Sequence, residues 1–522
     1  MATSGGCRSG PRSRPLSWRC VRVWVGAPSL GARRLGTPSL GAPSLGAPRL
    51  RARRLEVPRL WAPGLARVLL VSLLCAGVLA LVGAAAAVAG AAQGVASAPG
   101  GGSAPPVAGT EPPQTEPAGP QPQGDSADTS QRSGVRSPRS LLPTRLRRLL
   151  ARLGGGGAAL IVDDRGAVVA SLRAQTRLVP ASNVKLFTTA AALELFGPEQ
   201  RWQTRVVTAA GPDTEGRVSG PLYLVGGGDP TLASGLGGPT ASTGGPTLAE
   251  LARAVRDAGV RRVEGPIVAD ASRFDRLTGG PASAWRTSIW VGPLSALVVD
   301  RGLAASGRYF VADPALAAAR LFRRALSRLG IAVKGRETLG TAPAYGRELA
   351  ALSSPPLSLI VRVTNRDSDN FFAEMLLKQL ATRAATPGTS ELGLRIERVA
   401  LKRLGVQPRL VDGSGLSRAN RASPSEIVRL LRSALRRPWG AEWLRSLPLA
   451  GREGTLRRRF RSGPARGRCR AKTGTLTGVS ALSGYCRARS GERYWFSLLA
   501  NGTPTARART TEEAIVQALA GS

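Results

Sequence analysis

The chain has 522 residues, with 73 lysine or arginine against 33 aspartate or glutamate, a formal net charge of +40, and no histidine. The absence of histidine excludes Ser-His-Asp and Cys-His catalytic sites, histidine-ligated metals and the H-E-x-x-H zinc hydrolases. An enzyme of this composition that works near neutral pH needs a carboxylate, or a lysine with a lowered pKa, as its general base. Only five of the basic residues are lysine: Lys185, Lys334, Lys378, Lys402 and Lys472.

The arginine excess has two explanations. A preference for Arg over Lys, together with abundant Ala, Gly and Pro, is typical of a GC-rich genome. A functional excess would instead indicate attraction to nucleic acid or to an anionic membrane surface. The five cysteines contain no C-x-x-C pair, so we expect no cysteine-ligated metal. We therefore expect a protein without metal or organic cofactor.

Three segments precede the predicted folded region. Residues 1–67 are rich in arginine and repeat Pro-Ser-Leu-Gly-Ala, which predicts a disordered, low-complexity stretch. Residues 68–92 carry no charge, and 25 apolar residues at about 1.5 Å each span a bilayer as one transmembrane helix. Residues 93–140 are rich in Pro, Gly and Ser and predict a disordered linker.

The apolar segment 68–92 has two interpretations. The arginines before it would keep the N-terminus in the cytoplasm and make the segment an anchor in the cytoplasmic membrane. Small residues at 87–89 and 96–98 resemble signal-peptide cleavage sites instead. In both cases we expect the rest of the chain to lie outside the cytoplasmic membrane, on the periplasmic or cell-wall side.

Strand and helix patterns alternate from Leu141 onward. Apolar runs at 158–162 and 167–170 flank a Gly-containing turn and predict a hairpin. Apolar periodicity predicts helices near 182–195, 247–259, 314–329, 356–384, 424–436 and 510–520. Short apolar runs predict strands at 222–225, 266–269, 472–476, 479–485 and 494–501. The pattern indicates a mixed α/β (α+β) body with an antiparallel sheet rather than a regular βαβ repeat.

Ser182 and Lys185 form the first candidate catalytic pair. Residues three apart share one face of a helix, so the Lys185 amine can reach the Ser182 hydroxyl. The N-terminus of a helix also favours negative charge that develops near the serine. A Ser-x-x-Lys pair is therefore a nucleophile and base that needs no histidine, although an N-capped helix with a solvated lysine gives the same pattern.

Two further motifs carry polar groups at positions that chemistry could use. Ser368 and Asn370 lie two residues apart before an apolar run, where a turn between helices can aim both side chains into one cleft. Ordinary helix capping is the alternative explanation. Lys472 begins Lys-Thr-Gly-Thr at the start of a predicted strand, and the glycine lets a substrate backbone approach the strand closely. A glycine at a strand end beside a solvent-exposed lysine is the alternative.

The three motifs occur together, in the order Ser-x-x-Lys, Ser-x-Asn, Lys-Thr-Gly, which is the set found in penicillin-binding proteins and class A β-lactamases. Over roughly residues 150–520 the sequence resembles the serine-type D-alanyl-D-alanine carboxypeptidases/endopeptidases, the DacB-like class C penicillin-binding proteins. The stretches that add to the resemblance are 226–232, 411–418, 447–456 and 468–476.

The resemblance implies a penicillin-binding transpeptidase/β-lactamase-like fold with an inserted β-rich domain. Class A β-lactamases have a far shorter gap between the first two motifs than the 186 residues found here, which favours the family with the insertion. We expect residues 141–199 and 346–522 to form the transpeptidase-like domain and residues 200–345 to form the insert.

The resemblance also implies catalytic roles. Ser182 would attack the carbonyl between the two D-alanines of a peptidoglycan stem peptide and form an acyl-enzyme. Lys185 would take the serine proton, with its pKa lowered by partial burial and by the nearby Lys472 cation. Ser368 would relay a proton to the leaving amine, and Asn370 would position Lys185 and a substrate amide.

The third motif would bind the substrate. Lys472 and the hydroxyls of Thr473 and Thr475 would hold the terminal carboxylate beside Gly474. The backbone N–H groups of Ser182 and Thr475 would form the oxyanion hole. β-Lactams would act as covalent inhibitors of the same serine.

Roles in the stem-peptide pocket are a weaker implication of the resemblance. Asp270 and Phe274, which stand four residues apart, and Arg418 are the candidates. Turn chemistry and a surface charge explain the same residues equally well. The Asp-Gly-Ser-Gly run at 412–415 favours a structural turn over a catalytic element.

Cys469 and Cys486 suggest a separate hypothesis. If the strand at Lys472 folds back around Thr477-Gly478, the hairpin register places the two cysteines opposite each other. A cross-strand disulfide would then brace the active-site strand in an oxidising compartment. Two free thiols at strand ends are the alternative.

Three other functions stay open at this point. A β-lactamase or an esterase on the same fold would use the same motifs. A membrane-anchored cell-wall-binding protein with a decayed site is a second alternative, although both motif lysines are intact. A nucleic-acid-binding protein is the third, and we expect no nucleic-acid partner, because aromatic residues are few and no binding motif is present.

Overall fold

The computed structural model describes residues 138–236 and 244–522. Within these ranges, no helix is both long enough and apolar enough to cross a membrane. The predicted basic N-terminus 1–67, the apolar segment 68–92 and the linker up to residue 137 lie outside the described residues. The first described element is helix α2, Pro138–Ala151, three residues before the predicted start of the folded region.

A five-stranded antiparallel sheet joins the two ends of the described chain. Its strand order is β11-β12-β13-β1-β2, and β1 pairs with β13 so that Gly157 lies opposite Ala500. The strands are β1 (Gly157–Asp163), β2 (Val168–Leu172), β11 (Cys469–Leu476), β12 (Val479–Arg487) and β13 (Arg493–Asn501). The predicted hairpin at 158–170 and the three predicted C-terminal strands are confirmed.

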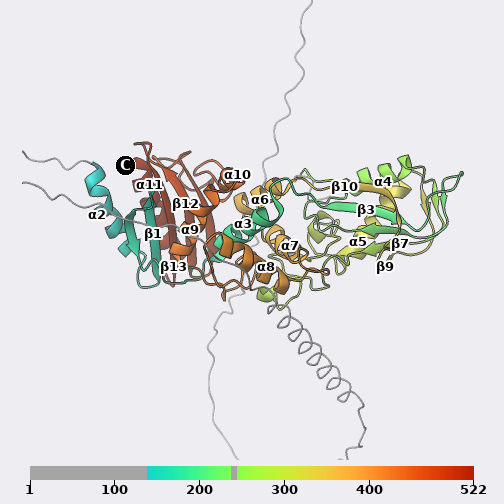
Figure 1. Ribbon diagram of the computed structural model, residues 1–522, viewed down its shortest axis with the longest axis horizontal. Helices are drawn as coiled ribbons and strands as arrows, with labels where there is room; N and C mark the ends of the chain where they lie inside the picture. Colours follow the sequence, from blue (N-terminus) through green and yellow to red (C-terminus); the bar gives the residue numbers. More distant parts are fainter. Residues whose placement is uncertain (1–137, 237–243) are drawn as a thin grey trace, which may run out of the picture. The chain divides into compact units, whose positions relative to one another are not determined.

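Helices cover both faces of this sheet (Figure 1). Helices α2 and α11 (Thr505–Gly521) pack on one face around a buried apolar cluster that includes Leu146, Phe496 and Ile515. Helix α9 (Pro424–Leu435) and the helical region around α3 lie on the other face. The sheet is buried on both sides, so its central strands are apolar along nearly their whole length.

The helical region is built around α3 (Val184–Phe196), whose first ten residues are all buried. A helix that is apolar all round belongs inside a core rather than at a surface. The other helices of this region are α6 (Leu357–Arg366), α7 (Asn370–Ala381), α8 (Ser390–Arg403) and α10 (Gly440–Arg445). Four 3-10 turns complete the described helical elements: η1 (Ala181–Asn183), η2 (Pro281–Ser283), η3 (Asp300–Gly302) and η4 (Gly454–Leu456).

A second sheet lies in the region where the insert was expected. Its order is β10-β3-β5-β7-β9, antiparallel up to β5 and parallel from β5 to β9. The strands are β3 (Gln203–Thr208), β5 (Leu222–Val225), β7 (Ile267–Asp270), β9 (Thr338–Leu339) and β10 (Arg347–Ser353). A small parallel sheet adds β4 (Arg217–Val218), β6 (Arg262–Val263) and β8 (Ala332–Val333).

Helices α4 (Leu248–Asp257) and α5 (Pro314–Ser327) share a separate apolar core with these strands. Both predicted helices are therefore confirmed, and their starts follow local capping. Thr247 and Glu250 form a capping box on α4, and the Asp313 side chain accepts from the backbone N–H of Leu316 on α5. The region is a mixed α/β unit, with more helix than the term β-rich implies.

Candidate active site

The three sequence motifs meet on one side of the first sheet. Ser182 lies on the 3-10 turn η1, directly before α3. Ser368 lies between α6 and α7, and Asn370 is the first residue of α7. Lys472 lies on β11, the edge strand of the sheet. The fold thus brings together residues that are up to 290 positions apart.

Lys185 is at the centre of the site. Its Nζ atom lies 3.2 Å from Ser182 Oγ, 2.7 Å from Asn370 Oδ1 and 2.6 Å from the carbonyl oxygen of Ser414. The Asn370 amide nitrogen donates to the carbonyl oxygen of Trp290 at 2.9 Å, which turns Oδ1 toward the lysine. A neutral amine has two N–H donors and one lone pair. Because the two oxygen atoms of Asn370 and Ser414 can only accept, the lone pair faces the Ser182 hydroxyl.

The protonation of Lys185 is set by its burial. Desolvation in the fully buried site lowers its pKa to about 8, and the carboxylates of Asp412, Glu374 and Asp369 oppose this shift. Burial, predicted as one cause, is the main one. The Lys472 cation was the other predicted cause, but it is not among the causes of the lowered pKa of Lys185. The repulsion between the two lysines instead lowers the pKa of Lys472, where it adds to the larger effect of burial.

Lys472 joins the second motif to the third. Its buried Nζ atom donates to Ser368 Oγ at 2.8 Å and to the carbonyl oxygen of Thr473 at 2.9 Å. Ser368 has a φ of +59°, a left-handed conformation that a non-glycine residue adopts at a cost. The backbone between α6 and α7 is therefore bent so that the serine side chain meets the lysine. Asp369 then starts α7 by accepting from the backbone N–H of Phe372.

The remaining residues of the third motif lie along the edge of β11. Thr473 Oγ1 is 2.8 Å from Thr455 Oγ1, and Thr475 Oγ1 accepts from the guanidinium of Arg509 at 3.0 Å. Gly474 lies so close to η1 that a Cβ atom there would be 2.8 Å from the carbonyl oxygen of Pro180. A side chain at this position would push the strand away from the turn that carries the serine.

A cavity of about 580 Å³ opens over these groups. It is lined by Ser182, Ser368, Asn370 and Thr475, and also by Arg418, one of the three predicted pocket residues. The Arg418 guanidinium donates to the carbonyl oxygen of Thr477. Trp290, which the sequence did not single out, also lines the cavity, and its side chain is 69% exposed.

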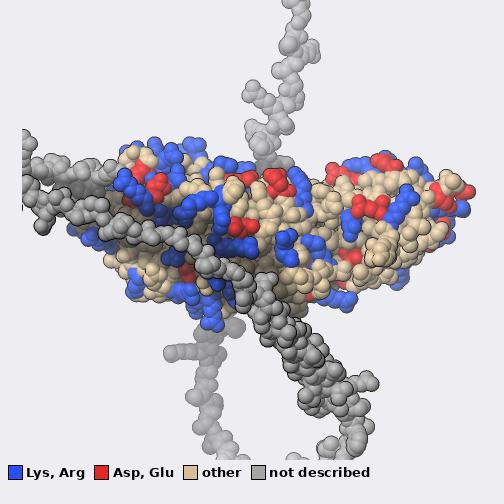
Figure 2. Space-filling model, viewed as in Figure 1, with Lys and Arg blue, Asp and Glu red and all other residues tan. Residues whose placement is uncertain are grey.

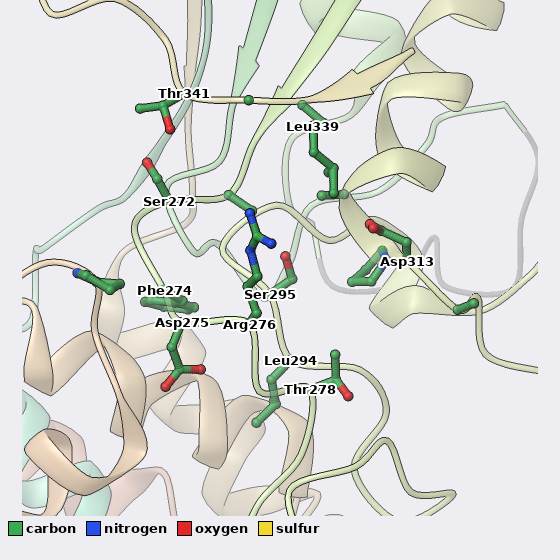
Figure 3. A pocket seen from close by; sticks show the side chains of 17 residues that line it. Ser272, Phe274, Asp275, Arg276, Thr278, Leu294, Ser295, Asp313, Leu339 and Thr341 are labelled. Atoms are coloured by element: carbon green, nitrogen blue, oxygen red, sulfur yellow. The ribbon is translucent and has the colours of Figure 1, made fainter. Parts of the chain in front are cut away.

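Asp270 and Phe274 do not line this cavity. The Asp270 carboxylate accepts from the backbone N–H groups of Ser272 and Ala342, at the end of β7. Phe274 is 3% exposed and lines a different cavity of about 660 Å³ (Figure 3). The turn chemistry that was the alternative explanation for Asp270 accounts for its contacts.

The loop at 412–417 supplies a functional group that sequence reasoning missed. Its Ser414 carbonyl accepts from Lys185, and the Ser414 backbone N–H donates to Glu374 Oε1 at 2.9 Å. Asp412 folds the loop by accepting from the backbone N–H groups of Gly415 and Ser417. The Asp-Gly-Ser-Gly run is thus a structural turn, as predicted, but the turn also positions a backbone acceptor for Lys185.

Glu374 is fully buried beside this loop. Desolvation and the neighbouring Asp412 carboxylate raise the pKa of Glu374 to about 7. The signal for its role was its place four residues after Asn370 on the same helix, which puts both side chains on one face of α7. The described residues contain no group of three His, Cys, Asp or Glu side chains placed to hold a metal ion.

The hairpin register predicted for the two cysteines is confirmed. Strands β11 and β12 pair so that Cys469 lies opposite Cys486, and their sulfur atoms form a disulfide. The disulfide lies three residues before Lys472 on the strand that carries the third motif. It therefore fixes β11 to its neighbour close to the site.

Comparisons with known proteins agree with this geometry. Residues 151–308 and 305–521 match the D-Ala-D-Ala carboxypeptidase 3 (S13) family. A D-alanyl-D-alanine carboxypeptidase of Actinomadura sp. (strain R39) is 33% identical over 451 residues, 70% of this chain and 81% of that protein. A carboxypeptidase of Mycobacterium tuberculosis is 33% identical over 345 residues, 62% of this chain and 71% of that protein.

One solved structure supports the fold. Penicillin binding protein 4 (dacB) of Haemophilus influenzae aligns with a TM-score of 0.62 at 23% sequence identity, and the alignment covers 71% of this chain and 97% of that protein. At this level of identity, the match establishes the mixed α/β penicillin-binding fold. The same protein has been solved in complex with a β-lactam.

Proposed function

The chain belongs to the D-Ala-D-Ala carboxypeptidase 3 (S13) family and is a serine peptidase that acts on peptidoglycan, and from this premise we propose that Ser182 is its nucleophile and Lys185 its general base. The observation that carries the proposal is the position of Lys185 Nζ, within hydrogen-bond reach of Ser182 Oγ and of two fixed acceptors. A lysine with a pKa of about 8 is neutral in a useful fraction of molecules near neutral pH.

Acylation follows from this geometry. Ser182 Oγ attacks the carbonyl carbon of the peptide bond between the two D-alanines, and its proton passes to Lys185 Nζ. The backbone N–H groups of Ser182 and Thr475 stabilise the oxyanion. As the C–N bond breaks, Ser368, held by Lys472 at 2.8 Å, gives its proton to the leaving amine and is reprotonated by Lys185, so the proton taken from Ser182 leaves with the amine. Water then hydrolyses the ester and releases the shortened stem peptide.

Charge explains how the terminal carboxylate would be selected. Lys472, Thr473 and Thr475 lie on the edge strand β11, and Thr475 lines the cavity at Ser182. Arg509 already donates to Thr475 Oγ1, so it adds positive charge next to the same position. A carboxylate bound there places the preceding carbonyl over Ser182, which favours release of a C-terminal D-alanine. A cross-linked peptide whose leaving group carries a carboxylate at the same place would be cut by the same steps, as an endopeptidase.

The partners and location follow from this activity. The substrate is the stem peptide of peptidoglycan, and β-lactams acylate Ser182 because they present a strained amide and a carboxylate in the same arrangement. We place the enzyme outside the cytoplasmic membrane, where peptidoglycan lies, with segment 68–92 as its anchor or export signal. The Cys469–Cys486 disulfide supports an oxidising compartment.

The experiment that tests the proposal is labelling with a fluorescent penicillin. The parent chain should bind one label covalently, and a Ser182→Ala variant should bind none. Mass spectrometry of a digest should place the adduct on the peptide that contains Ser182. Label on another residue, or equal label on the variant, would refute the assignment. Release of D-alanine from a pentapeptide, compared with cleavage of a cross-linked dimer, then measures the two peptidase activities.

A further inference from the structure

A second cavity, which is strongly basic, lies at the end of β11 where the strand begins. A hollow of about 710 Å³ opens between α10, the loop after it and the ends of β11, β12 and β13, and it shares no lining residue with the cavity at Ser182. Seven of its 13 lining residues are arginines, and we call it the arginine hollow: Arg445, Arg452, Arg466, Arg468, Arg470, Arg487 and Arg493.

The general arginine excess does not account for this concentration. Arginine makes up 68 of the 522 residues, so 13 residues drawn at that frequency would include about two. The catalytic cavity has 17 lining residues and one arginine, Arg418, and the cavity in Figure 3 has 17 and one arginine, Arg276. The hollow is therefore a local feature of the fold rather than a sample of the composition.

Most of its charge is not balanced by carboxylates. Arg470 pairs with Glu453 at 2.8 Å, and Arg493 lies 3.9 Å from Asp164. In the part of the chain that the structure describes, the other five guanidinium groups have no carboxylate within 4 Å. Figure 2 shows basic side chains spread over much of the visible face, with acidic side chains among them. Like charges held close together are unfavourable unless an anion lies between them.

The backbone that carries these side chains is held rigidly. Arg468 and Arg470 flank Cys469, and Arg487 follows Cys486, so the disulfide lies directly beneath three of the arginines. The backbone N–H of Arg487 also donates to the carbonyl oxygen of Arg468 at 3.1 Å. The Arg470 guanidinium donates to the carbonyl oxygen of Arg445, the last residue of α10, and to that of Leu447 in the loop after it. A site built in advance in this way loses little conformational freedom when it binds.

We propose that the arginine hollow binds an anionic cell-wall polymer whose repeating units are joined by phosphodiesters. A guanidinium pairs two N–H groups with two oxyanion oxygens, and each phosphodiester offers two such oxygens and keeps its charge at every physiological pH. A concave hollow accepts a flexible chain and cannot lie flat on a bilayer. Tyr485 is its one aromatic lining residue, so it lacks the stacking platform with which proteins bind successive bases.

The choice of a wall polymer rests on the proposed function, which places the enzyme among such polymers. Binding would hold the enzyme in the wall without occupying the cavity at Ser182, since the two cavities share no residue. The polymer would therefore raise the local concentration of stem peptide and leave the acylation chemistry unchanged.

The test measures binding of a fluorescently labelled, short poly(glycerol phosphate) to the full chain in detergent micelles, by anisotropy at several salt concentrations. The test variant is Arg452→Gln/Arg468→Gln/Arg487→Gln, in which three exposed arginines of the hollow lose their charge. The matched control is Arg320→Gln/Arg324→Gln/Arg328→Gln, which removes the same charge from the exposed side of α5. Acylation by penicillin is measured on every protein.

The test variant should bind at least about tenfold more weakly. The negative slope of log K against log salt should become smaller in magnitude by about 2, because three phosphate contacts are lost. The control should bind like the parent, and all three proteins should acylate equally. Equal loss in both variants would show attraction to net charge alone and overturn the proposal. Tighter binding of polyglutamate, of DNA or of phosphatidylglycerol vesicles would overturn the phosphodiester assignment. Loss of acylation in the parent would refute the proposed function and leave the binding result standing.

Discussion

The carbonyl oxygen of Ser414 lies 2.6 Å from Lys185 Nζ, closer than the Ser182 hydroxyl at 3.2 Å. The Lys185 amine therefore donates a hydrogen bond to a backbone carbonyl group, which cannot take up its proton. Whatever fixes that carbonyl also fixes the direction of the lysine lone pair. Two buried carboxyl groups hold that carbonyl: Asp412 accepts from the Gly415 N–H of the same peptide group, and Glu374 accepts from the Ser414 backbone N–H.

Replacement of Glu374 tests this support. Glu374→Gln keeps an oxygen that can accept from Ser414 N–H, so its acylation rate should stay within about threefold of the parent, whereas Glu374→Ala should lose about 10- to 100-fold. The removed negative charge had raised the pKa of Lys185, so the rising limb of the pH–rate profile should move to lower pH in Glu374→Gln. Stopped-flow acylation from pH 6 to 10 measures both effects, and an unchanged profile in both variants would contradict the role.

The lysine base predicts the pH dependence of the parent. Only neutral Lys185 can accept the serine proton, and its pKa is about 8, so the acylation rate should rise with pH through about 8 and then level off. Lys185→Ala should lower the rate by about 10²- to 10⁴-fold, the usual contribution of a general base. Lys402→Ala is the matched control, because that lysine is exposed on α8. A rate that falls between pH 7 and 9 would contradict the assignment.

Gly415 should not tolerate a side chain. It has a φ of +84°, and a Cβ atom there would lie 2.0 Å from the carbonyl oxygen of Ala181, the residue before Ser182. We expect Gly415→Ala to abolish most penicillin labelling and to lower the free energy of unfolding by more than about 1 kcal/mol. Gly478→Ala is the control, since its φ is +70° but nothing lies within 4 Å. If urea unfolding and labelling give the same result for both variants, backbone strain alone explains the effect.

The disulfide should contribute to stability. Cys469 and Cys486 are 17 residues apart, and closing a loop of this size stabilises a protein by about 3 kcal/mol. We expect Cys469→Ala/Cys486→Ala to unfold at lower urea concentration than the oxidised parent and close to the reduced parent. Intact mass after alkylation, with and without reductant, checks the bond itself. Labelling of both thiols without reductant would show that the bond is absent.

The sequence predicted the parts of this site that are local in the chain. Ser182 with Lys185, Ser368 with Asn370 and Lys472 with its threonines are each short motifs, and the hairpin register of the cysteines follows from one turn. Helical spacing places Glu374 on the same face of α7 as Asn370, but it does not indicate the contact with Ser414, which lies 40 positions further along the chain. Trp290 reaches the cavity through an irregular segment, where patterns carry little information.

The misplaced or missed elements have similar causes. Asp270 is the last residue of strand β7, a position typical of functional carboxylates, but its carboxylate accepts from the backbone N–H groups of Ser272 and the distant Ala342. The segment 356–384 was predicted as helical throughout, apart from a turn at the second motif, and it divides into α6 and α7 there because Ser368 adopts a positive φ. Helix α8 was missed, since its buried residues include polar Ser390 and Glu397 among the apolar ones.

The pairing of β1 with β13 has a consequence for the order of events during folding. Gly157, near the start of the described chain, lies opposite Ala500, and the edge strand with Lys472 is attached to the sheet only through β12. Contacts between such distant residues form slowly. A chain that emerges from its N-terminus can fold η1 and α3 early, but β11 and β12 can join β1 only after β13 has formed. We therefore expect no reaction with stem peptides before β13 has paired with β1.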